Sequence, residues 1–380
     1  MAASTPAHRA ILAHMRSRRA FILALIAGQL ATRGRVEAAA TPDGLTASHE
    51  PIRFPDGFGS HPDTRIEWWY VTGALEAASL TWGFQITFFR ASTGIAAAAS
   101  SRFAARQLLF AHAAVSDLAR QRLRHDQRIS RSGFGIAGAA LAATTLKVRD
   151  WTLERREVDG ASRYAARASS ETAAFAFDLA LRATQPILLQ GDGGWSRKGP
   201  RPSQASRYYS EPQLDVAGTL AIDGKSVAVT GRAWLDHEWS DAFLDRDAVG
   251  WDWIGMNLDD GAALTAFQLR RADGSVLWTG GGFRPAGGTA RDFADGEVVF
   301  APGRVWTSPA TGARYPVEWT VATPAGRFTV TSLLDDQELD SRASTGAIYW
   351  EGLSRLADAS GRRVGRGYLE MTGYAQRLVL

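Results

Sequence analysis

The 380-residue sequence predicts an all-β protein made of two tandem antiparallel β-barrels. Three observations favour this fold class. A Trp-rich segment recurs once at an offset of 183 residues, short runs alternate apolar and polar residues, and Gly-containing turns separate these runs. No amphipathic stretch is long enough to predict a core helix, and a pair of β-sandwiches is the alternative fold.

The first 40 residues predict an export signal. The twin arginine Arg18-Arg19 precedes an apolar run to Ala31, and Ala38-Ala39-Ala40 offers a cleavage site before Thr41. The apolar run has about 12 residues, whereas about 20 are needed to cross a bilayer, so we expect no membrane anchor after cleavage. This Tat-type signal over residues 1–40 predicts a periplasmic or secreted protein.

Composition excludes several classes of protein. With 45% hydrophobic residues, 13 Trp, 17 Phe and 8 Tyr, the chain must bury large rings and does not resemble a disordered protein. The net charge of +4 comes from the first 40 residues, because removing them leaves 37 basic and 38 acidic residues. A nucleic-acid partner is therefore not expected. The absence of Cys rules out disulfides, thiol catalysis and a lipid anchor on Cys.

Known cofactor and catalytic motifs are also missing from the sequence. It contains no P-loop, no nucleophile elbow, no dinucleotide-binding motif after a strand and no zinc-protease motif. We therefore predict no cofactor. A metal site is not expected either, since no familiar metal-ligand spacing occurs among the histidines left after export, which are His49, His61, His112, His125 and His237.

The internal repeat organises the rest of the chain. Each copy reads as a strand, a short polar turn and a second strand, and Leu258-Asp259-Asp260-Gly261 is typical of a hairpin turn. The repeat predicts two related domains, an N-terminal one over residues 41–215 and a C-terminal one over 216–380. Identical residues recur at four positions, with Trp68, Leu75, Phe84 and Gln85 returning as Trp251, Leu258, Phe267 and Gln268.

Trp-rich and polar motifs follow one another through the whole mature chain. They include His61-Pro62, Glu67-Trp68-Trp69-Tyr70, Ala111-His112-Ala113, Trp234-Leu235-Asp236-His237-Glu238-Trp239, Trp251-Asp252-Trp253, Tyr349-Trp350-Glu351-Gly352, and Leu369-Glu370 with Gly373-Tyr374. In these motifs the sequence resembles the AttH-like family, which is related to the carotenoid 1,2-hydratases (hydroxyneurosporene synthases). The resemblance implies two tandem lipocalin-like (calycin) barrels and, in the hydratases, protonation of an alkene carbon beside an aromatic cavity.

The segment Asp236-His237-Glu238 is the densest polar cluster. On a strand, Asp236 and Glu238 share one face with Trp234, and His237 points to the opposite face. His237 is either a proton donor or acceptor in an aromatic pocket, or a buried His hydrogen-bonded to backbone and enclosed by Trp. The resemblance implies that His237 and Trp239 carry part of the hydratase pattern.

Other acids supply alternatives for the same chemistry. The resemblance implies a carboxylate on the following strand, but residues 263–269 contain none. Asp252 is either a substitute acid or a hydrogen-bonding brace. Glu67 and Glu351 each lie beside a ring cluster, and each either anchors Arg or backbone donors or titrates with a raised pKa at a site. His112 is a core His or a site residue.

These observations define a candidate site. The catalytic candidates are His237, Asp236, Asp252 and Glu351, and the ligand-binding candidates are Glu67, Trp68, Tyr70, His112, Trp239, Trp253, Trp350 and Tyr374. The leading interpretation is an exported protein that binds a hydrophobic small molecule, such as an isoprenoid, polyene or lipid-like compound, in an aromatic cavity near the junction of the barrels. The alternatives are a hydratase or isomerase acting on an unsaturated isoprenoid, and an accessory partner of an envelope transport complex.

Overall fold

The computed structural model of the protein describes residues 50–95, 101, 103–241 and 244–378. The expected signal peptide lies outside these residues. The described chain consists of β-strands and one 3-10 turn, η1 (Asp56–Phe58), which confirms the all-β prediction. Among the described residues no helix has the length and apolar character needed to span a membrane.

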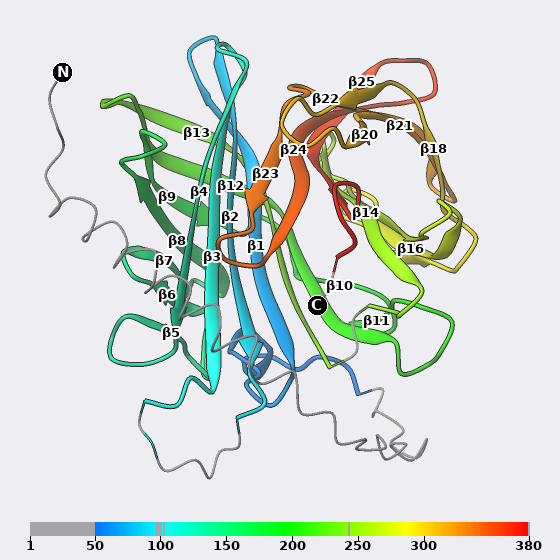
Figure 1. Cartoon of the computed structure of the whole chain (residues 1–380). Coiled ribbons are helices and arrows are strands. Elements are labelled where there is room, and N and C mark those ends of the chain that lie inside the picture. The colour runs from blue at the N-terminus through cyan, green and yellow to red at the C-terminus, as the bar shows by residue number, and fades with distance from the viewer. Residues whose placement is uncertain (1–49, 96–100, 102, 242–243, 379–380) are drawn as a thin grey trace, which may run out of the picture. The chain divides into compact units, whose positions relative to one another are not determined.

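The N-terminal strands form a 13-stranded antiparallel sheet, sheet A, which curves into a nearly closed barrel (Figure 1). Its main path runs β4-β3-β2-β1-β13-β12-β9-β8-β7-β6-β5, and β10 and β11 pair with β12. The strands are β1 (Ile66–Ala77), β2 (Leu80–Ser92), β3 (Gln107–Asp117), β4 (Arg122–Arg131), β5 (Ala137–Ala139), β6 (Thr145–Val148), β7 (Trp151–Val158), β8 (Ala161–Ser170), β9 (Phe175–Arg182), β10 (Leu188–Leu189), β11 (Trp195–Arg197), β12 (Ala205–Ile222) and β13 (Lys225–Ser240).

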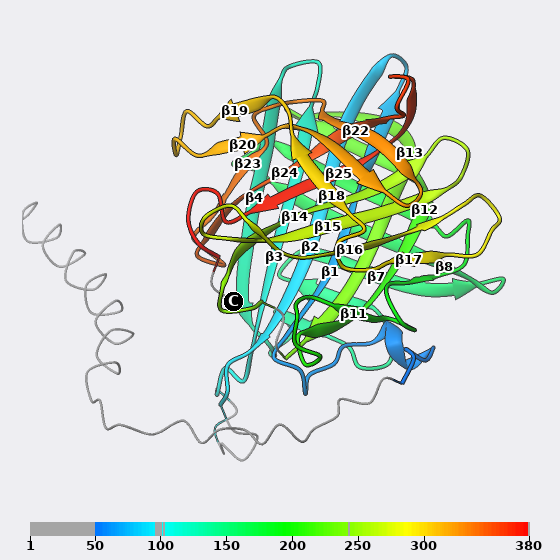
Figure 2. The same cartoon turned by 90° about the vertical axis from the view of Figure 1, so that its right-hand side faces the viewer.

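The C-terminal strands form a 10-stranded sheet, sheet B, seen from its side in Figure 2. Its main path runs β17-β16-β15-β14-β25-β24-β22-β21-β18, β23 pairs with β24, and β19 with β20 forms a separate ribbon. The strands are β14 (Ala248–Leu258), β15 (Ala263–Arg271), β16 (Val276–Arg284), β17 (Arg291–Phe293), β18 (Val299–Pro302), β19 (Val305–Thr307), β20 (Arg314–Pro316), β21 (Glu318–Thr323), β22 (Gly326–Ser332), β23 (Glu338–Ser341), β24 (Ala347–Ala357) and β25 (Arg363–Thr372).

Both sheets have the same connectivity. In sheet A the first strand, β1, pairs with its successor β2 and also with the last strand, β13. In sheet B, β14 pairs in the same way with β15 and with the last strand, β25. Pairing of the first strand with the last is what curls a meander toward a barrel. The two tandem lipocalin-like β-modules predicted from the sequence are therefore present.

The sequence repeat corresponds to the hairpins β1–β2 and β14–β15. The turn before Ala262 has the predicted form, because Gly261 has a φ of +95° and its N–H donates to the Leu258 carbonyl. The ungapped alignment holds only for the first strand of each copy. Tyr70 lies opposite Thr87, whereas Trp253 lies opposite Phe267, so the second strands are displaced by three residues. The two hairpin tips have different lengths, which accounts for this displacement.

Large rings fill three apolar clusters. Trp69 belongs to the interior of sheet A, and Trp350 to the interior of sheet B. A third cluster joins the two sheets through residues such as Tyr70, Trp234 and Trp253. The two sheets therefore pack against each other through a shared apolar layer.

The chain passes from sheet A to sheet B between Ser240 and Ala248. The predicted boundary between residues 215 and 216 falls inside β12, whose C-terminal half still pairs with β13 and β9. Residues Ser48–Leu380 pack as one compact unit. The division into two domains stays a prediction.

Candidate functional site

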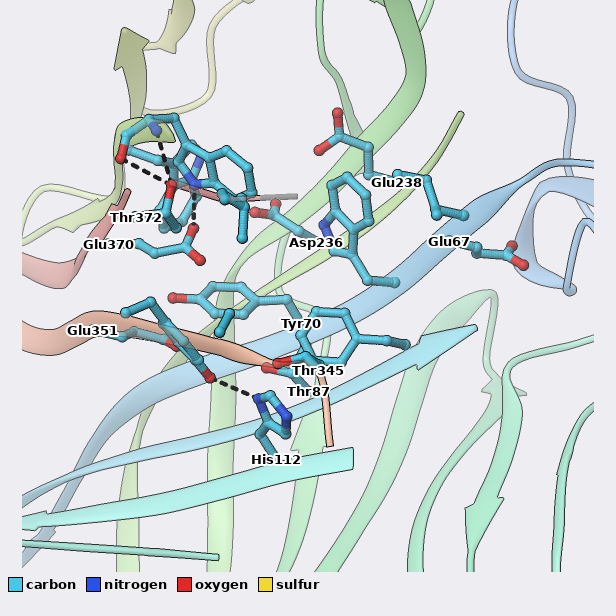
Figure 3. A pocket seen from close by; sticks show the side chains of 18 of the residues that line it. Glu67, Tyr70, Thr87, His112, Asp236, Glu238, Thr345, Glu351, Glu370 and Thr372 are labelled. Atoms are coloured by element: carbon cyan, nitrogen blue, oxygen red, sulfur yellow. Dashed lines mark hydrogen bonds between the residues drawn. The ribbon is translucent and has the colours of Figure 1, made fainter. Parts of the chain in front are cut away.

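A cavity of about 250 Å³ lies between the two sheets. Sheet A contributes residues of β1, β2, β3 and β13 to its wall, and sheet B contributes residues of β14, β15, β24 and β25. Nine Trp, Tyr and Phe rings line the cavity, and carboxyl groups project among them (Figure 3). An apolar chamber with a few placed polar groups is the usual form of a small-molecule site.

Strand pairing explains which side chains of sheet A reach the cavity. Residues that lie opposite each other on antiparallel strands point to the same face, and so do residues two apart on one strand. Tyr70 lies opposite Thr87 on one side and Asp236 on the other. The neighbouring row on the same face consists of Phe89, Trp68, Glu238 and Tyr208.

Sheet B presents two matching rows. Trp253 lies opposite Phe267 and Glu370, and Glu370 in turn lies opposite Glu351. The neighbouring cavity-lining residues of sheet B are Leu269, Trp251, Thr372 and Tyr349. Because Glu351 and Glu370 face each other across one strand pair, a buried and a partly buried carboxyl group share one side of the cavity.

Asp236 is buried and accepts three hydrogen bonds. Its Oδ1 atom lies 2.6 Å from Ser210 Oγ and 2.6 Å from Trp234 Nε1, and its Oδ2 atom lies 2.8 Å from the Tyr208 hydroxyl. Burial raises the pKa of Asp236 to about 7, although these three donors favour the ionised form. Asp236 is therefore a well-held carboxylate that can exchange a proton near neutral pH.

Glu238 is a cavity-lining acid that is paired with a lysine. The Lys198 ammonium lies 3.1 Å from its Oε1 atom, and the Ser206 hydroxyl donates to the same oxygen. Burial raises the pKa of Glu238, and Lys198 opposes this effect. Lys198 and Arg90 are the basic residues among the described cavity-lining side chains, and each has a carboxylate partner.

Glu351 has a different environment. Its side chain is 3% exposed, and neither carboxyl oxygen has a hydrogen-bond partner among the described residues. Tyr70 and Gln85 face the carboxyl group and favour its ionised form, although neither meets the geometry of a hydrogen bond to it, and the Tyr70 hydroxyl has no hydrogen-bond partner in this part of the chain. Burial raises the pKa of Glu351 well above its usual range, and the charge of Glu370 adds to the effect.

Glu370 completes the carboxyl pair. Trp251 Nε1 donates to its Oε2 atom at 2.9 Å, and Figure 3 shows Tyr70 between Glu370 and Glu351. Burial raises the pKa of Glu370 to about 7, with the charges of Asp236 and Glu238 acting in the same direction. The pair therefore places Glu351, whose pKa is raised by burial, beside Glu370, whose pKa of about 7 allows it to accept a proton near neutral pH.

His112 lines the cavity and bridges the two sheets. Its Nδ1 atom lies 2.9 Å from the Tyr349 hydroxyl, and its Nε2 atom lies 2.9 Å from Ser344 Oγ. Burial lowers the pKa of His112 to about 3, so the ring is neutral at physiological pH. A neutral ring with both nitrogens occupied serves as a positioning residue for Tyr349, in agreement with the satisfied-His alternative.

Glu67 is the centre of a second polar cluster, formed by Ser60, His61, Glu67, Arg90 and His237 and here termed the Glu67 cluster. Arg90 Nε lies 2.7 Å from Oε2 of Glu67, and both side chains are fully buried. The two imidazoles donate to Oε1, His61 through Nδ1 at 2.8 Å and His237 through Nε2 at 2.9 Å. The Ser60 hydroxyl and the His61 backbone N–H also donate to this carboxylate. Glu67 and Arg90 border the cavity.

The charges of the Glu67 cluster are fixed by these contacts. Burial alone would raise the pKa of Glu67, but the hydrogen bonds from His237 and His61 hold it well below its usual range. Burial lowers the pKa of His237 to about 4, so its ring is neutral, with Nδ1 accepting from the Tyr209 hydroxyl at 3.2 Å. His237 stacks on Trp69 inside sheet A and does not line the cavity.

The same cluster brings together ligand types that bind metals. One ligand atom each from His61, Glu67 and His237 lies within 4.8 Å of the others. The sequence spacing gave no sign of this, because the three residues meet only in the folded sheet. The buried Arg90 guanidinium already neutralises the carboxylate, and a cation would have to share it with this positive charge. Ion pairing and hydrogen bonding account for the cluster without a metal.

Four further predicted site residues lie away from the cavity. Asp252 is bonded to Gln268, to Arg270 at 2.8 Å and to the Tyr374 hydroxyl at 2.9 Å, which corresponds to the bracing alternative. Trp350 donates to the Asp335 carbonyl within sheet B. The Trp239 ring stacks on the His61 ring, with 3.7 Å between the ring centroids. Asp252 and Trp350 each lie between two cavity-facing neighbours, so strand alternation turns them to the opposite face.

Seven of the twelve candidate residues predicted from the sequence line the cavity, namely Asp236, Glu351, Glu67, Trp68, Tyr70, His112 and Trp253. The prediction did not include Glu238, Glu370, Lys198 or Arg90. Glu370 was visible as an acid in a Trp- and Tyr-rich motif, but only the strand register places it opposite Glu351. Lys198 and Arg90 had no local signal.

Comparisons with known proteins agree with this architecture. The AttH-like family model matches residues 46–374. An AttH-type protein of Nitrosomonas europaea is 48% identical, with a TM-score of 0.79 over 86% of this chain and 98% of that protein. Kievitone hydratase of Nectria haematococca has the same fold at 15% identity, with a TM-score of 0.65 over 87% of this chain and 95% of that protein.

A third structure, CghA with Sch210972, is 13% identical, with a TM-score of 0.50 over 82% of this chain and 89% of that protein. A comparison with curated proteins finds no match. The family model spans most of the chain, and the similarity to the Nitrosomonas protein extends over nearly the whole of that protein. The chain therefore belongs to the AttH-like family.

Proposed function

We propose that this protein is an acid–base enzyme of the hydratase or isomerase type, which binds a small, apolar, unsaturated molecule in the cavity between its sheets. The observation that carries the proposal is Glu351, a buried carboxyl group on the cavity wall with no hydrogen-bond partner among the described residues. An unpaired buried carboxyl group is costly to a fold and is neutral at physiological pH. Such a group is suited to donating a proton to a substrate.

The geometry supports a simple reaction course. Glu351 gives its proton to one carbon of a substrate C=C bond, and positive charge develops on the other carbon. The faces of Tyr70 and Trp253 and the carboxylate of Asp236 stabilise that charge. Water then adds to the cation and loses its proton to Glu370, or Glu370 removes a proton from a neighbouring carbon. The first course gives a hydrated product and the second an isomer, and the proton balance closes when Glu370 returns its proton to Glu351.

The carboxyl pair favours catalysis over simple transport of a ligand. A carrier needs only apolar walls, whereas two unequal carboxyl groups on adjacent strands add a cost that binding alone does not require. That a protein of the same fold is named a hydratase also favours an enzyme.

The proposal includes the export expected from residues 1–40. A variant with Lys at Arg18 and Arg19 should then remain in the cytoplasm, and its recovery in the periplasm would contradict export by this route.

The test is turnover of short unsaturated isoprenoid alcohols, followed by mass spectrometry for a gain of one water and by chromatography for isomers. Glu351→Gln should lower turnover by about 10²–10⁴-fold while leaving substrate binding intact, because the amide keeps the shape and cannot donate the proton. Glu76→Gln is the matched control, since Glu76 is an exposed acid on β1 that pairs with Arg366. Unchanged turnover in Glu351→Gln would contradict the assignment, and binding without turnover in the unaltered protein would favour a carrier.

A further inference from the structure

A second hollow adjoins the cavity on the side of β16 and β17. It is a groove of about 520 Å³ lined by residues that include Gln190, Trp195, Arg197, Trp278 and Asp292. Its walls come from the segment around β11 in sheet A and from β15, β16 and β17 in sheet B. The groove is separate from the cavity that holds the carboxyl pair.

Phe267 is the side chain that lines both hollows. Its ring is 5% exposed and lies against the bare Cα of Gly280, where an added Cβ would come within 2.7 Å of Phe267 Cζ. Lys198 Nζ lies 4.3 Å from the ring centroid. These two contacts restrict the position of the ring, which lines the boundary between the cavity and the groove.

The volume of the cavity limits the size of the ligand that it can hold. This volume is about 250 Å³. Sites for drug-sized ligands usually measure about 300–1,000 Å³. The cavity alone therefore suits a compact molecule, and a long chain would have to continue past Phe267 into the groove.

We propose that Phe267 is the specificity-determining residue that limits ligand length, so that the site takes compact apolar molecules such as short isoprenoids and excludes long polyenes. Removing the ring joins the cavity to the groove and lets longer chains bind. The inference rests on the proposed function only for the position of the ligand. Its test measures binding, so it can fail while the proton-transfer proposal holds, and the reverse.

The experiment uses straight-chain primary alcohols of 6 to 14 carbons as probes, with the quenching of tryptophan fluorescence as the signal, since Trp68, Trp251 and Trp253 line the cavity. In the unaltered protein, affinity should rise about four-fold per methylene until the cavity is full and then stop rising. In Phe267→Ala the rise should continue for several more methylenes. Leu269→Ala is the matched control, because Leu269 lines the cavity but not the groove.

Two results of the chain-length experiment would overturn the proposal. A break at the same chain length in Phe267→Ala and in Leu269→Ala, or no break in the unaltered protein, would overturn the proposal. Near-ultraviolet circular dichroism checks that each variant is folded. Should Phe267→Ala not fold, Gly280→Ala provides a second test, because the added methyl group pushes the ring toward the cavity and should move the break to shorter chains. An unchanged break in Gly280→Ala would then overturn the proposal.

Discussion

Glu67 and Glu351 are both buried acids beside aromatic rings, one in each sheet, yet they differ in every contact. The carboxylate of Glu67 accepts hydrogen bonds from Ser60, Arg90 and two imidazoles. The carboxyl group of Glu351 has no partner among the described residues. The comparison shows that burial does not by itself decide the protonation state of an acid, since the neighbouring donors do.

The difference arises from what the neighbouring strands present. Glu67 lies near the start of β1, where the preceding loop supplies Ser60 and His61 and β2 supplies Arg90. Glu351 lies within β24, where the facing residue on β25 is another acid, Glu370. The first acid is therefore a hydrogen-bonded brace of sheet A, and the second is an acid with a raised pKa on the cavity wall, without a hydrogen-bond partner among the described residues.

The same substitution at the two acids should separate them by the largest margin. Glu67→Gln leaves the buried Arg90 charge without its counter-ion and should cost about 3–5 kcal/mol of unfolding free energy. Glu351→Gln replaces one neutral group by another of the same shape and should change stability by less than about 1 kcal/mol. Urea unfolding at pH 7 measures both values.

Glu76→Gln on the exposed face of β1 is the control, and its effect should stay within about 0.5 kcal/mol. Equal losses of unfolding free energy in Glu67→Gln and Glu351→Gln would show that the two acids do not differ in charge.

A smaller effect is expected in the pH dependence of the unfolding free energy, where Glu67 and Glu370 should act in opposite directions. The pKa of Glu370 is about 7 in the folded protein and about 4.3 in an unfolded chain, so the folded state binds the extra proton between these values. Stability contributed by this group therefore falls as pH rises from about 5 to 7, by at most about 1.4 kcal/mol per pH unit. Glu370→Gln should flatten that decline in urea unfolding curves at pH 5, 6 and 7.

The lowered pKa of Glu67 has the opposite sign. Its stabilising contribution is complete above the unfolded pKa of about 4.3 and is lost only as pH falls below that value. Glu67→Gln should consequently lower stability at all three pH values without altering the slope between them. A slope that changes in Glu67→Gln and persists in Glu370→Gln would reverse the assignment.

Local sequence patterns predicted much of the architecture. The recurrence of Trp68 as Trp251 located the first strand of each sheet, and strand alternation correctly placed Asp236 and Glu238 on one face and His237 on the other. The same alternation, applied to Asp252 between Trp251 and Trp253, would have turned that acid away from the cavity.

The remaining site residues depend on long-range pairing. Glu370 becomes significant only through the register of β24 with β25, and Arg90 only through the register of β2 with β1. The histidines of the Glu67 cluster come from positions far apart in the chain and meet through the closure of sheet A by β13. Neither composition nor motif spacing contains this information, because register is set by the turns and the packed faces together.

The most direct test of Glu351 as the proton donor is a measurement of its protonation state. Infrared spectroscopy at pH 7 detects the carbonyl band of a neutral carboxylic acid, which an ionised carboxylate lacks. Asp236 and Glu370, whose pKa values are about 7, also contribute to this band at pH 7. We therefore expect the band in the unaltered protein, a decrease of its intensity in Glu351→Gln and no decrease in Glu67→Gln. A spectrum that Glu351→Gln leaves unchanged, or one whose acid band disappears in Glu67→Gln, would contradict this assignment.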